Sequence, residues 1–451
     1  MMMKRFFCSI KSNKKDTAKT GTGILTKSLL AAFVPICFSP AAFSIGIEDV
    51  VDGGNDYAWE KVEIPGTVCS DGSQYKFWVH DAPSNNLLIL FEGGGACWDY
   101  ESCSGALGIL GAANPNGLPD DYITQFKARF VSPLVNGADP GLPFRPKSPI
   151  ATNGWDVVYM PYCTGDVHTG NMVRTYEDPT GANPPITFRH MGYHNTIEAL
   201  DWLAARFPSI NKLLVTGFSA GGVASAAGYY FAKRTLNPTA GYMLNDSGPL
   251  FPAPNASFKS RQLHDTIRVA WGLDDVLSTL PASFDINDFG SATAMVSIEF
   301  PNDQLAYTAY SSDFNFSRFS YERFFPGSTQ ADILDMWRED QANLVGEMDQ
   351  RANFSYHIPW QRPINDSHCS TIITFVGSHV CPSIRKKRWY EYFEFPFTQS
   401  WKCPEGLDSM EAFLDRWIDG NEVIRDIEPE NNYNNEDPGM QIISGPINDA
   451  L

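Results

Sequence analysis

The chain has 451 residues, of which 43% are hydrophobic and 19% charged, and its formal net charge is −18. This composition excludes a disordered or collagen-like chain, and the length suits one large α/β domain with insertions, or two domains. The excess of acidic residues opposes binding to nucleic acid and to anionic lipid surfaces.

The first 44 residues have the features of an export signal. Seven Lys or Arg residues accompany an apolar run at 29–38, and small residues around Ala42 and Ser44 suit a cleavage site. The apolar run is too short to cross a bilayer, and no later stretch is long and apolar enough to do so. Removal of residues 1–44 leaves 27 basic and 51 acidic residues, a net charge of −24. We therefore expect a secreted or periplasmic protein with no stable membrane insertion and no nucleic-acid partner.

Short apolar runs alternate with helical stretches along the rest of the chain. The runs predict strands, and the helical periodicity of apolar side chains between them predicts helices. The expected strands cover residues 75–80, 87–91, 155–160, 213–217, 242–245 and 295–300. The expected helices cover residues 192–207, 221–233 and 409–418. This alternation predicts an α/β fold with a mainly parallel central sheet and helices on both of its faces.

We expect a single domain over residues 45–420, because no stretch has the composition of a linker. Within it, residues 111–153 are rich in Pro, Gly and Asn and predict a long surface excursion. Residues 280–330 are rich in aromatic side chains and predict an irregular insertion that acts as a lid or a substrate wall. Residues 421–451 are acidic and rich in Asn, and predict a mobile C-terminal tail.

Ser219 has the sequence context of a catalytic nucleophile. Residues 213–222 read Leu-Leu-Val-Thr-Gly-Phe-Ser-Ala-Gly-Gly, which is an apolar strand, a Gly-x-Ser-x-Gly turn and the start of a small-residue helix. Such a tight turn from strand to helix needs Gly217 and Gly221 to avoid steric clashes, and it exposes the serine at the end of the sheet. The N-terminus of the helix stabilises negative charge that develops there.

Three glycines after another apolar run predict an oxyanion hole. Residues 88–98 read Leu-Ile-Leu-Phe-Glu-Gly-Gly-Gly-Ala-Cys-Trp. Glycine lets the backbone approach a ligand closely, and the N–H groups of such a loop stabilise an oxyanion together with the N–H that follows the nucleophile. We assign this role to Gly94, Gly95 and Ala220. No Lys follows at the spacing of a phosphate-binding loop.

Four motifs carry a resemblance to a known family. They are Phe91 to Trp98, Tyr162 to Gly170, Gly217 to Gly222, and the pair Asp303 and His368 in their contexts. Together they resemble the pectin acetylesterase/Notum family of carboxylesterases, and the resemblance extends from about Cys69 to His368. It implies an α/β-hydrolase fold with large loop insertions, a Ser-Asp-His triad, no metal, and cleavage of O-acyl esters.

The acid of the triad has several candidates, because the expected chain order is Ser, then Asp or Glu, then His. Asp303, in Phe-Pro-Asn-Asp-Gln, follows the expected strand at 295–300 and is the first choice. Asp246 follows the expected strand at 242–245, and it could instead be a loop carboxylate that fixes the turn under the site. The neighbouring Asp274 and Asp275 are further alternatives.

The expected base is His368, in Asn-Asp-Ser-His-Cys, whose position matches the one that the resemblance implies. Its Nε2 would take the proton of Ser219 and return it to the leaving alcohol. His379 is the alternative. His168 and Asp166 lie within one of the shared motifs, and they either shape the pocket or hold its loop.

Seven cysteines lie beyond the export signal, which contains Cys8 and Cys37. In an exported protein they favour disulfides, and their odd number leaves one without an intramolecular partner. The resemblance implies two pairs, Cys69 with Cys163 and Cys97 with Cys103. For Cys369, either Cys381 or Cys403 is a possible partner.

The sequence therefore predicts an exported serine carboxylesterase that hydrolyses acetyl or short-chain O-acyl esters of a small molecule or a carbohydrate. The alternatives are an acyltransferase with the same triad and a non-catalytic carbohydrate-binding protein on a hydrolase scaffold. We expect no cofactor and no metal, because the spacing of His368, Cys369, His379 and Cys381 is irregular for a zinc site.

Overall fold

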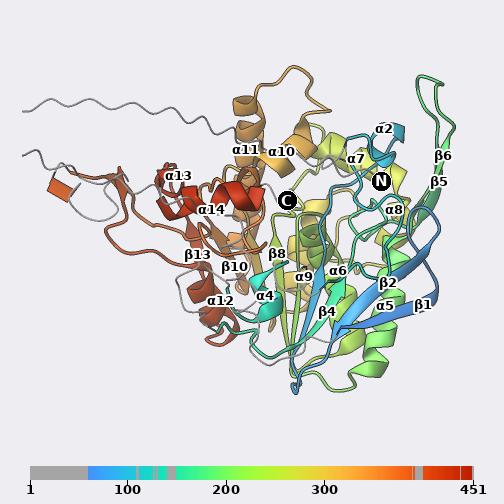
Figure 1. Cartoon of the computed structure of the whole chain (residues 1–451), viewed down its shortest axis with the longest axis horizontal. Coiled ribbons are helices and arrows are strands. Elements are labelled where there is room, and N and C mark those ends of the chain that lie inside the picture. The colour runs from blue at the N-terminus through green and yellow to red at the C-terminus, as the bar shows by residue number, and fades with distance from the viewer. Residues whose placement is uncertain are drawn as a thin grey trace, which may run out of the picture. The chain divides into compact units, whose positions relative to one another are not determined.

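A nine-stranded sheet forms the centre of the described part of the chain (Figure 1). The computed structural model describes residues 59–107, 111–124, 127, 131–139, 149–388, 390–391, 400–436 and 438–448. The expected export signal, with Cys8 and Cys37, lies outside these residues. Tyr57–Leu451 forms one compact unit.

The strand order in the sheet is β1-β2-β4-β3-β7-β8-β9-β10-β13. The first two strands are antiparallel to each other and β2 is antiparallel to β4, whereas all other neighbours are parallel. The bounds are β1 (Glu60–Val68), β2 (Gln74–His80), β3 (Leu87–Phe91), β4 (Asp156–Met160), β7 (Lys212–Phe218), β8 (Ala240–Asp246), β9 (Gln304–Thr308), β10 (Phe354–Ile358) and β13 (Arg425–Ile427).

The central strands are buried on both faces, which explains their continuous apolar sequences. In β3, Leu87, Ile89 and Phe91 pack into one hydrophobic core, and Leu88 and Leu90 pack into another. This division follows from the two-residue period of a strand. The sheet therefore separates two cores, each of which is closed by helices.

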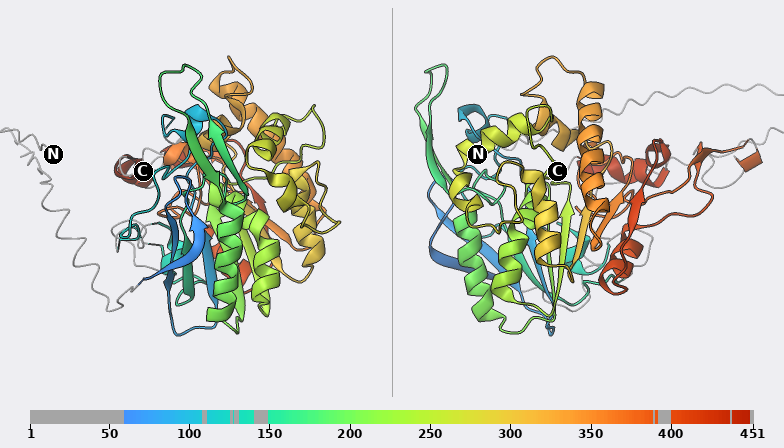
Figure 2. Two further views of the ribbon diagram at one scale, coloured as in Figure 1. Left: turned by 90° about the vertical axis from the view of Figure 1, so that its right-hand side faces the viewer. Right: turned by 180° about the vertical axis from the view of Figure 1, so that it is seen from behind.

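Helices cover both faces of the sheet (Figure 2). Side chains of α5 (Gly192–Arg206), α6 (Ala220–Leu236), α9 (Ala292–Glu299) and α11 (Gln330–Asp349) join the first core. Side chains of α4 (Pro133–Asn136) and α12 (Met410–Ile418) join the second. The chain therefore has an α/β fold with a mostly parallel central sheet flanked by helices, as the sequence predicts.

The remaining elements lie around this sheet and its flanking helices. They are α2 (Tyr100–Cys103), the hairpin of β5 (Met172–Tyr176) and β6 (Ile186–His190), α7 (Arg261–Ala270), α8 (Leu273–Leu277), α10 (Phe314–Tyr321), the pair β11 (Arg385–Lys386) and β12 (Trp401–Lys402), α13 (Tyr433–Glu436) and α14 (Pro438–Asn448). None of the described helices is long and apolar enough to cross a bilayer.

One predicted strand is wrong. Residues 295–300 lie in and directly after helix α9, whose Met295 and Val296 face the first core. A short apolar run does not distinguish a buried strand from a buried helix. The strand comes later, as β9, so Asp303 stands before a strand and not after one.

Three expected irregular regions contain core elements. Residues 280–330 include α9, β9 and α10, and β9 is a central strand. Residues 421–451 include β13, which pairs with β10 in the main sheet and is not part of a mobile tail. Within 111–153, Leu134 and Val135 of α4 are buried in the second core.

Three disulfides join the described cysteines. Cys69–Cys163 and Cys97–Cys103 form as the resemblance implies, and the third bridge joins Cys381 to Cys403. Cys369 is the free cysteine and is buried.

Candidate active site

Ser219 occupies a sharp turn between β7 and α6. Its backbone angles are φ 58° and ψ −123°, a conformation that costs a non-glycine residue about 1–3 kcal/mol. Its N–H donates to the Asp246 carbonyl at 2.9 Å. A Cβ at Gly217 would lie 2.3 Å from the Gly221 carbonyl oxygen, and one at Gly221 would lie 2.0 Å from that of Phe91. Both glycines are therefore required, because the turn packs directly on the end of β3.

The glycine loop after β3 lies against the nucleophile. A Cβ at Gly93 would be 2.9 Å from the Cβ of Ser219. The next two glycines have positive φ, 147° at Gly94 and 67° at Gly95. In the described part of the chain, the N–H groups of Gly94, Gly95 and Ala220 are paired with no acceptor. These three N–H groups are available to a ligand beside Ser219.

Buried polar groups support this loop from behind. The Glu92 carboxylate accepts hydrogen bonds from the Tyr122 hydroxyl at 2.8 Å and the Tyr162 N–H at 3.2 Å, and it pairs with Lys127 at 2.7 Å. His168 Nε2 donates to the Glu92 carbonyl at 2.9 Å. Burial lowers the pKa of His168 to about 4, so the ring is neutral at pH 7. His168 thus holds the glycine loop in place.

Asp166 ties the same region to helix α5. Its carboxylate accepts hydrogen bonds from the Thr164 hydroxyl and from the N–H groups of His168, Gly170 and Gly192, at 2.6–3.1 Å. Gly192 is the first residue of α5. Asp166 therefore has a structural role in this loop.

His368 pairs with Asp313, which sequence analysis did not single out. His368 Nδ1 lies 2.8 Å from Asp313 Oδ2, and both side chains are buried. The other carboxylate oxygen of Asp313 accepts the Phe316 N–H at the start of α10. Burial raises the pKa of the Asp313 carboxyl, and the neighbouring His368 opposes that shift. Asp313 follows β9, so it lies beyond the carboxyl end of that strand.

Asp303 does not contact His368. Its carboxylate accepts the Tyr229 hydroxyl at 2.8 Å and pairs with Lys233 Nζ at 2.8 Å, both from the second half of α6. Asp303 precedes β9 and therefore lies at the amino end of the parallel strands, whereas Ser219 lies at their carboxyl end. The carboxylate that pairs with His368 is therefore that of Asp313, and not that of Asp303 as the sequence predicts. The sequence offered one indication of Asp313, because an aspartate directly before a helix is a typical N-cap residue.

Asp246 joins the loops of the nucleophile and the base. Its carboxylate accepts the N–H groups of Ser370 at 2.9 Å and Thr371 at 2.8 Å, while its carbonyl accepts the Ser219 N–H. It is the loop carboxylate under the site that the sequence left as an alternative. Of the remaining candidates, Asp274 pairs with Arg268 at the surface.

Hydrogen bonds through Asp246 and Ser247 link the loop of Ser219 to the loop of His368. Cys369 N–H donates to the Ser247 hydroxyl at 3.1 Å, directly after Asp246. Among the described residues, no hydrogen bond joins Ser219 Oγ to His368 Nε2. Hydrogen bonds of this kind are often long without substrate and shorten when it binds. A buried carboxylate that accepts the Nδ1–H of an imidazole, as Asp313 does for His368, orients that ring.

An apolar cavity of about 80 Å³ lies beside the first turns of α6. Val223 and Ala224 of that helix line it, together with His168 and Phe91 from beneath the glycine loop. The far wall is apolar and comes from α7, α8, α9 and adjoining loops, with Ile267, Trp271, Leu273, Val276, Leu280, Phe284, Phe289 and Met295. The cavity begins one helical turn from Ser219.

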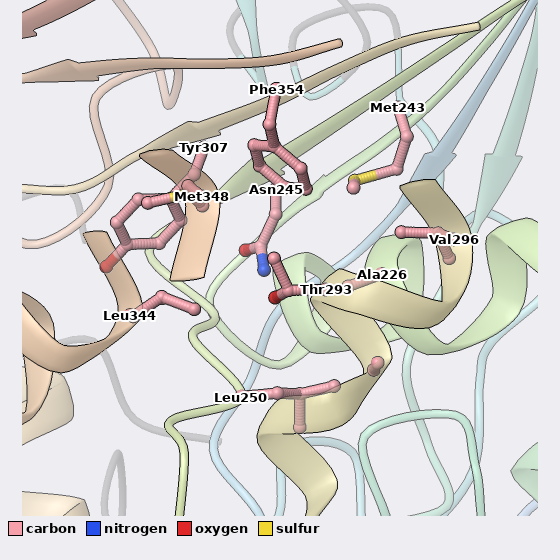
Figure 3. Close-up of a pocket in the computed structure, with 11 residues that line it drawn as sticks. Ala226, Met243, Asn245, Leu250, Thr293, Val296, Tyr307, Leu344, Met348 and Phe354 are labelled. Carbon is pink, nitrogen blue, oxygen red and sulfur yellow. The ribbon is translucent and has the colours of Figure 1, made fainter. Parts of the chain in front are cut away.

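A second, smaller cavity of about 10 Å³ lies between α6, α9 and α11 (Figure 3). Its polar side chains include Asn245, Thr293 and Tyr307. Asn245 exchanges hydrogen bonds with the N–H and carbonyl of Gly248 and so fixes the loop after β8. Neither Ser219 nor His368 lines this cavity, which is a packing space in the first core.

Several aromatic residues of the predicted lid pack against rings from other parts of the chain. Trp98, after the glycine loop, contacts Phe319 and Phe324 with ring centroids 5.2 and 5.9 Å apart. The Phe316 ring contacts both Trp337 and His368, with ring centroids 5.8 and 6.2 Å apart. Phe316 thus connects this aromatic cluster to the His368 ring.

Comparison of the sequence with protein-family models and with curated proteins gave no match.

Proposed function

We propose that this protein is an exported serine carboxylesterase of the α/β-hydrolase type, with Ser219, His368 and Asp313 as its catalytic triad. The buried contact of His368 Nδ1 with Asp313 Oδ2, at the edge of the sheet where Ser219 is held in a strained turn, is the observation that carries the proposal. The chain order Ser, Asp, His agrees with it.

The reaction would proceed through an acyl-enzyme. Ser219 Oγ attacks the ester carbonyl, and His368 Nε2 takes the serine proton and then gives it to the leaving alcohol. Asp313 accepts the Nδ1–H and stabilises the imidazolium. The N–H groups of Gly94, Gly95 and Ala220 bind the oxyanion. Water, activated by His368, then releases the acid.

The substrate class follows from the resemblance to pectin acetylesterases and Notum, whose family we propose for this chain. We propose acetyl or short-chain esters, on a carbohydrate or a small molecule. The apolar cavity beside Val223 and Ala224 offers room for a longer acyl chain. Export is proposed from the basic and apolar N-terminal segment, and the three disulfides are compatible with it.

The test compares Asp313→Asn with Asp303→Asn, which are the same substitution at two positions ten residues apart. Hydrolysis of p-nitrophenyl acetate, butyrate, octanoate and palmitate is measured for the purified wild type, Ser219→Ala, Asp313→Asn and Asp303→Asn. We expect Asp313→Asn to lower kcat about 10³–10⁴-fold, because the imidazole loses its orienting acceptor. Ser219→Ala should lose at least as much. Asp303→Asn should retain kcat within a few-fold, although it weakens a buried ion pair.

The opposite result for the two Asp variants would restore Asp303 as the acid. A wild type that hydrolyses none of these esters and no acetylated polysaccharide would contradict the esterase proposal. The profile over acyl chain length separates an acetylesterase from a hydrolase of lipid esters.

A further inference from the structure

A histidine and two aspartates meet beside the last strands of the sheet. His357 of β10 and Asp426 of β13 are register partners in a parallel pair, so their side chains project from the same face. Asp408 stands just before Ser409, the N-cap residue of α12. A ring nitrogen of His357 and one carboxylate oxygen of each aspartate lie within 4.8 Å of one another. The cluster shares no residue with the proposed catalytic triad.

The hydrogen bonding of His357 decides which ring nitrogen is free. Its Nε2 lies 2.9 Å from the Ser378 carbonyl oxygen, which can only accept, so Nε2 carries the hydrogen. Nδ1 then has a lone pair. His357 is 0% exposed and Nδ1 has no hydrogen-bond partner among the described residues. A histidine that binds a metal donates its other N–H to a backbone carbonyl in this way.

The two aspartates bring their carboxylate oxygens together beside His357. One oxygen of each lies within 4.8 Å of the other and of a ring nitrogen of His357. Arg416 forms an ion pair with Asp408 and lies 3.8 Å from Glu422. A divalent cation at this point would be held by one oxygen of each aspartate and by the imidazole.

We propose that His357, Asp408 and Asp426 bind one zinc ion. A neutral imidazole nitrogen with two carboxylate oxygens is a donor set that suits Zn²⁺, whereas Ca²⁺ requires oxygen ligands in larger number. The three side chains come from β10, from β13 and from the segment before α12. The ion would therefore fasten the C-terminal part of the chain to the central sheet, and it takes no part in ester cleavage.

The test measures zinc binding and thermal stability of the full mature chain. Chelator-treated protein is titrated with Zn²⁺ and with Ca²⁺, and the bound metal is counted per chain. We expect one zinc per chain and a higher Tm with zinc than without it. Asp426→Asn and Asp408→Asn keep the side-chain shape and should each weaken zinc binding by roughly 10–100-fold or more. His264→Gln is the matched control, because His264 is also buried with an unpartnered Nδ1.

Three results would overturn the proposal. One is a wild type that binds no zinc. Another is equal zinc binding by the wild type and both Asp variants. The third is tighter binding of Ca²⁺ than of Zn²⁺. Because the readouts are metal content and Tm, the outcome does not depend on whether the protein hydrolyses esters.

Discussion

Ser219 shows how a single residue is held in an unfavourable conformation by its neighbours. The strained backbone is fixed by the N–H bond to Asp246 on one side and by the helix start at Ala220 on the other. A strain of about 1–3 kcal/mol persists only where the surroundings determine the conformation, and such positions are common at active sites. The strain at Ser219 therefore agrees with the proposed role of this residue as the nucleophile.

His264 gives a prediction about stability at low pH. Its side chain is buried against the Phe289 ring, and burial lowers its pKa to about 4, from 6.5 for a solvated histidine. The unfolded chain binds a proton at pH 5 that the folded chain does not. Proton binding by the unfolded chain therefore lowers the free energy of unfolding as the pH falls from 6.5 towards 4. At pH 5 this loss of stability is about 2 kcal/mol, and above pH 6.5 it is absent.

The measurement is urea unfolding at pH 7.5 and pH 5. The wild type should lose about 2 kcal/mol more free energy of unfolding than His264→Leu over this interval. Equal losses in the two proteins would show that His264 is already solvated or protonated in the folded state.

In helix α6, substitution of Gly221 and of Gly228 by alanine should change the stability of the protein in opposite directions. In Gly221→Ala the new Cβ would lie 2.0 Å from the Phe91 carbonyl oxygen, so we expect failure to fold or a loss of more than about 4 kcal/mol. In Gly228→Ala the nearest atom would be 4.0 Å away, and alanine should stabilise the helix by about 0.5–1 kcal/mol. Urea unfolding of both variants checks this. A tolerated Gly221→Ala would contradict the close packing of the turn on β3.

At the level of elements, the regular strands of the sheet were predictable and α9 was not. The strands β3, β4, β7 and β8 consist mainly of apolar residues, and they lie where expected. The run at 295–300 has the same composition but belongs to a helix, because its buried face is decided by packing against α6 and α11. This error placed Asp303 after a strand, whereas it precedes β9.

For the whole molecule, the disulfides predict a difference in stability between two double variants. The Cys69–Cys163 bridge closes a separation of 94 residues, whereas Cys97–Cys103 closes one of 6. Loop-closure entropy gives about 4–5 kcal/mol for the first and about 2 kcal/mol for the second. We expect Cys69→Ser/Cys163→Ser to be the less stable of the two double variants in urea unfolding. The reverse order would mean that strain or residual structure outweighs chain entropy.

The turn from strand to helix at Ser219 and the glycine loop after β3 were predictable from sequence, because each depends on a local pattern. Gly217 to Gly221 specify a turn that only glycines permit, and Gly93 to Gly95 follow a buried strand directly. The partner of His368 depended on tertiary structure. Whether Asp303 or Asp313 reaches His368 depends on which end of β9 each occupies, and therefore on where that strand begins. The cluster of His357, Asp408 and Asp426 likewise exists only because β13 pairs with β10.

Contacts between segments so distant in the chain arise from the packing of the whole sheet. Local sequence patterns do not contain this information.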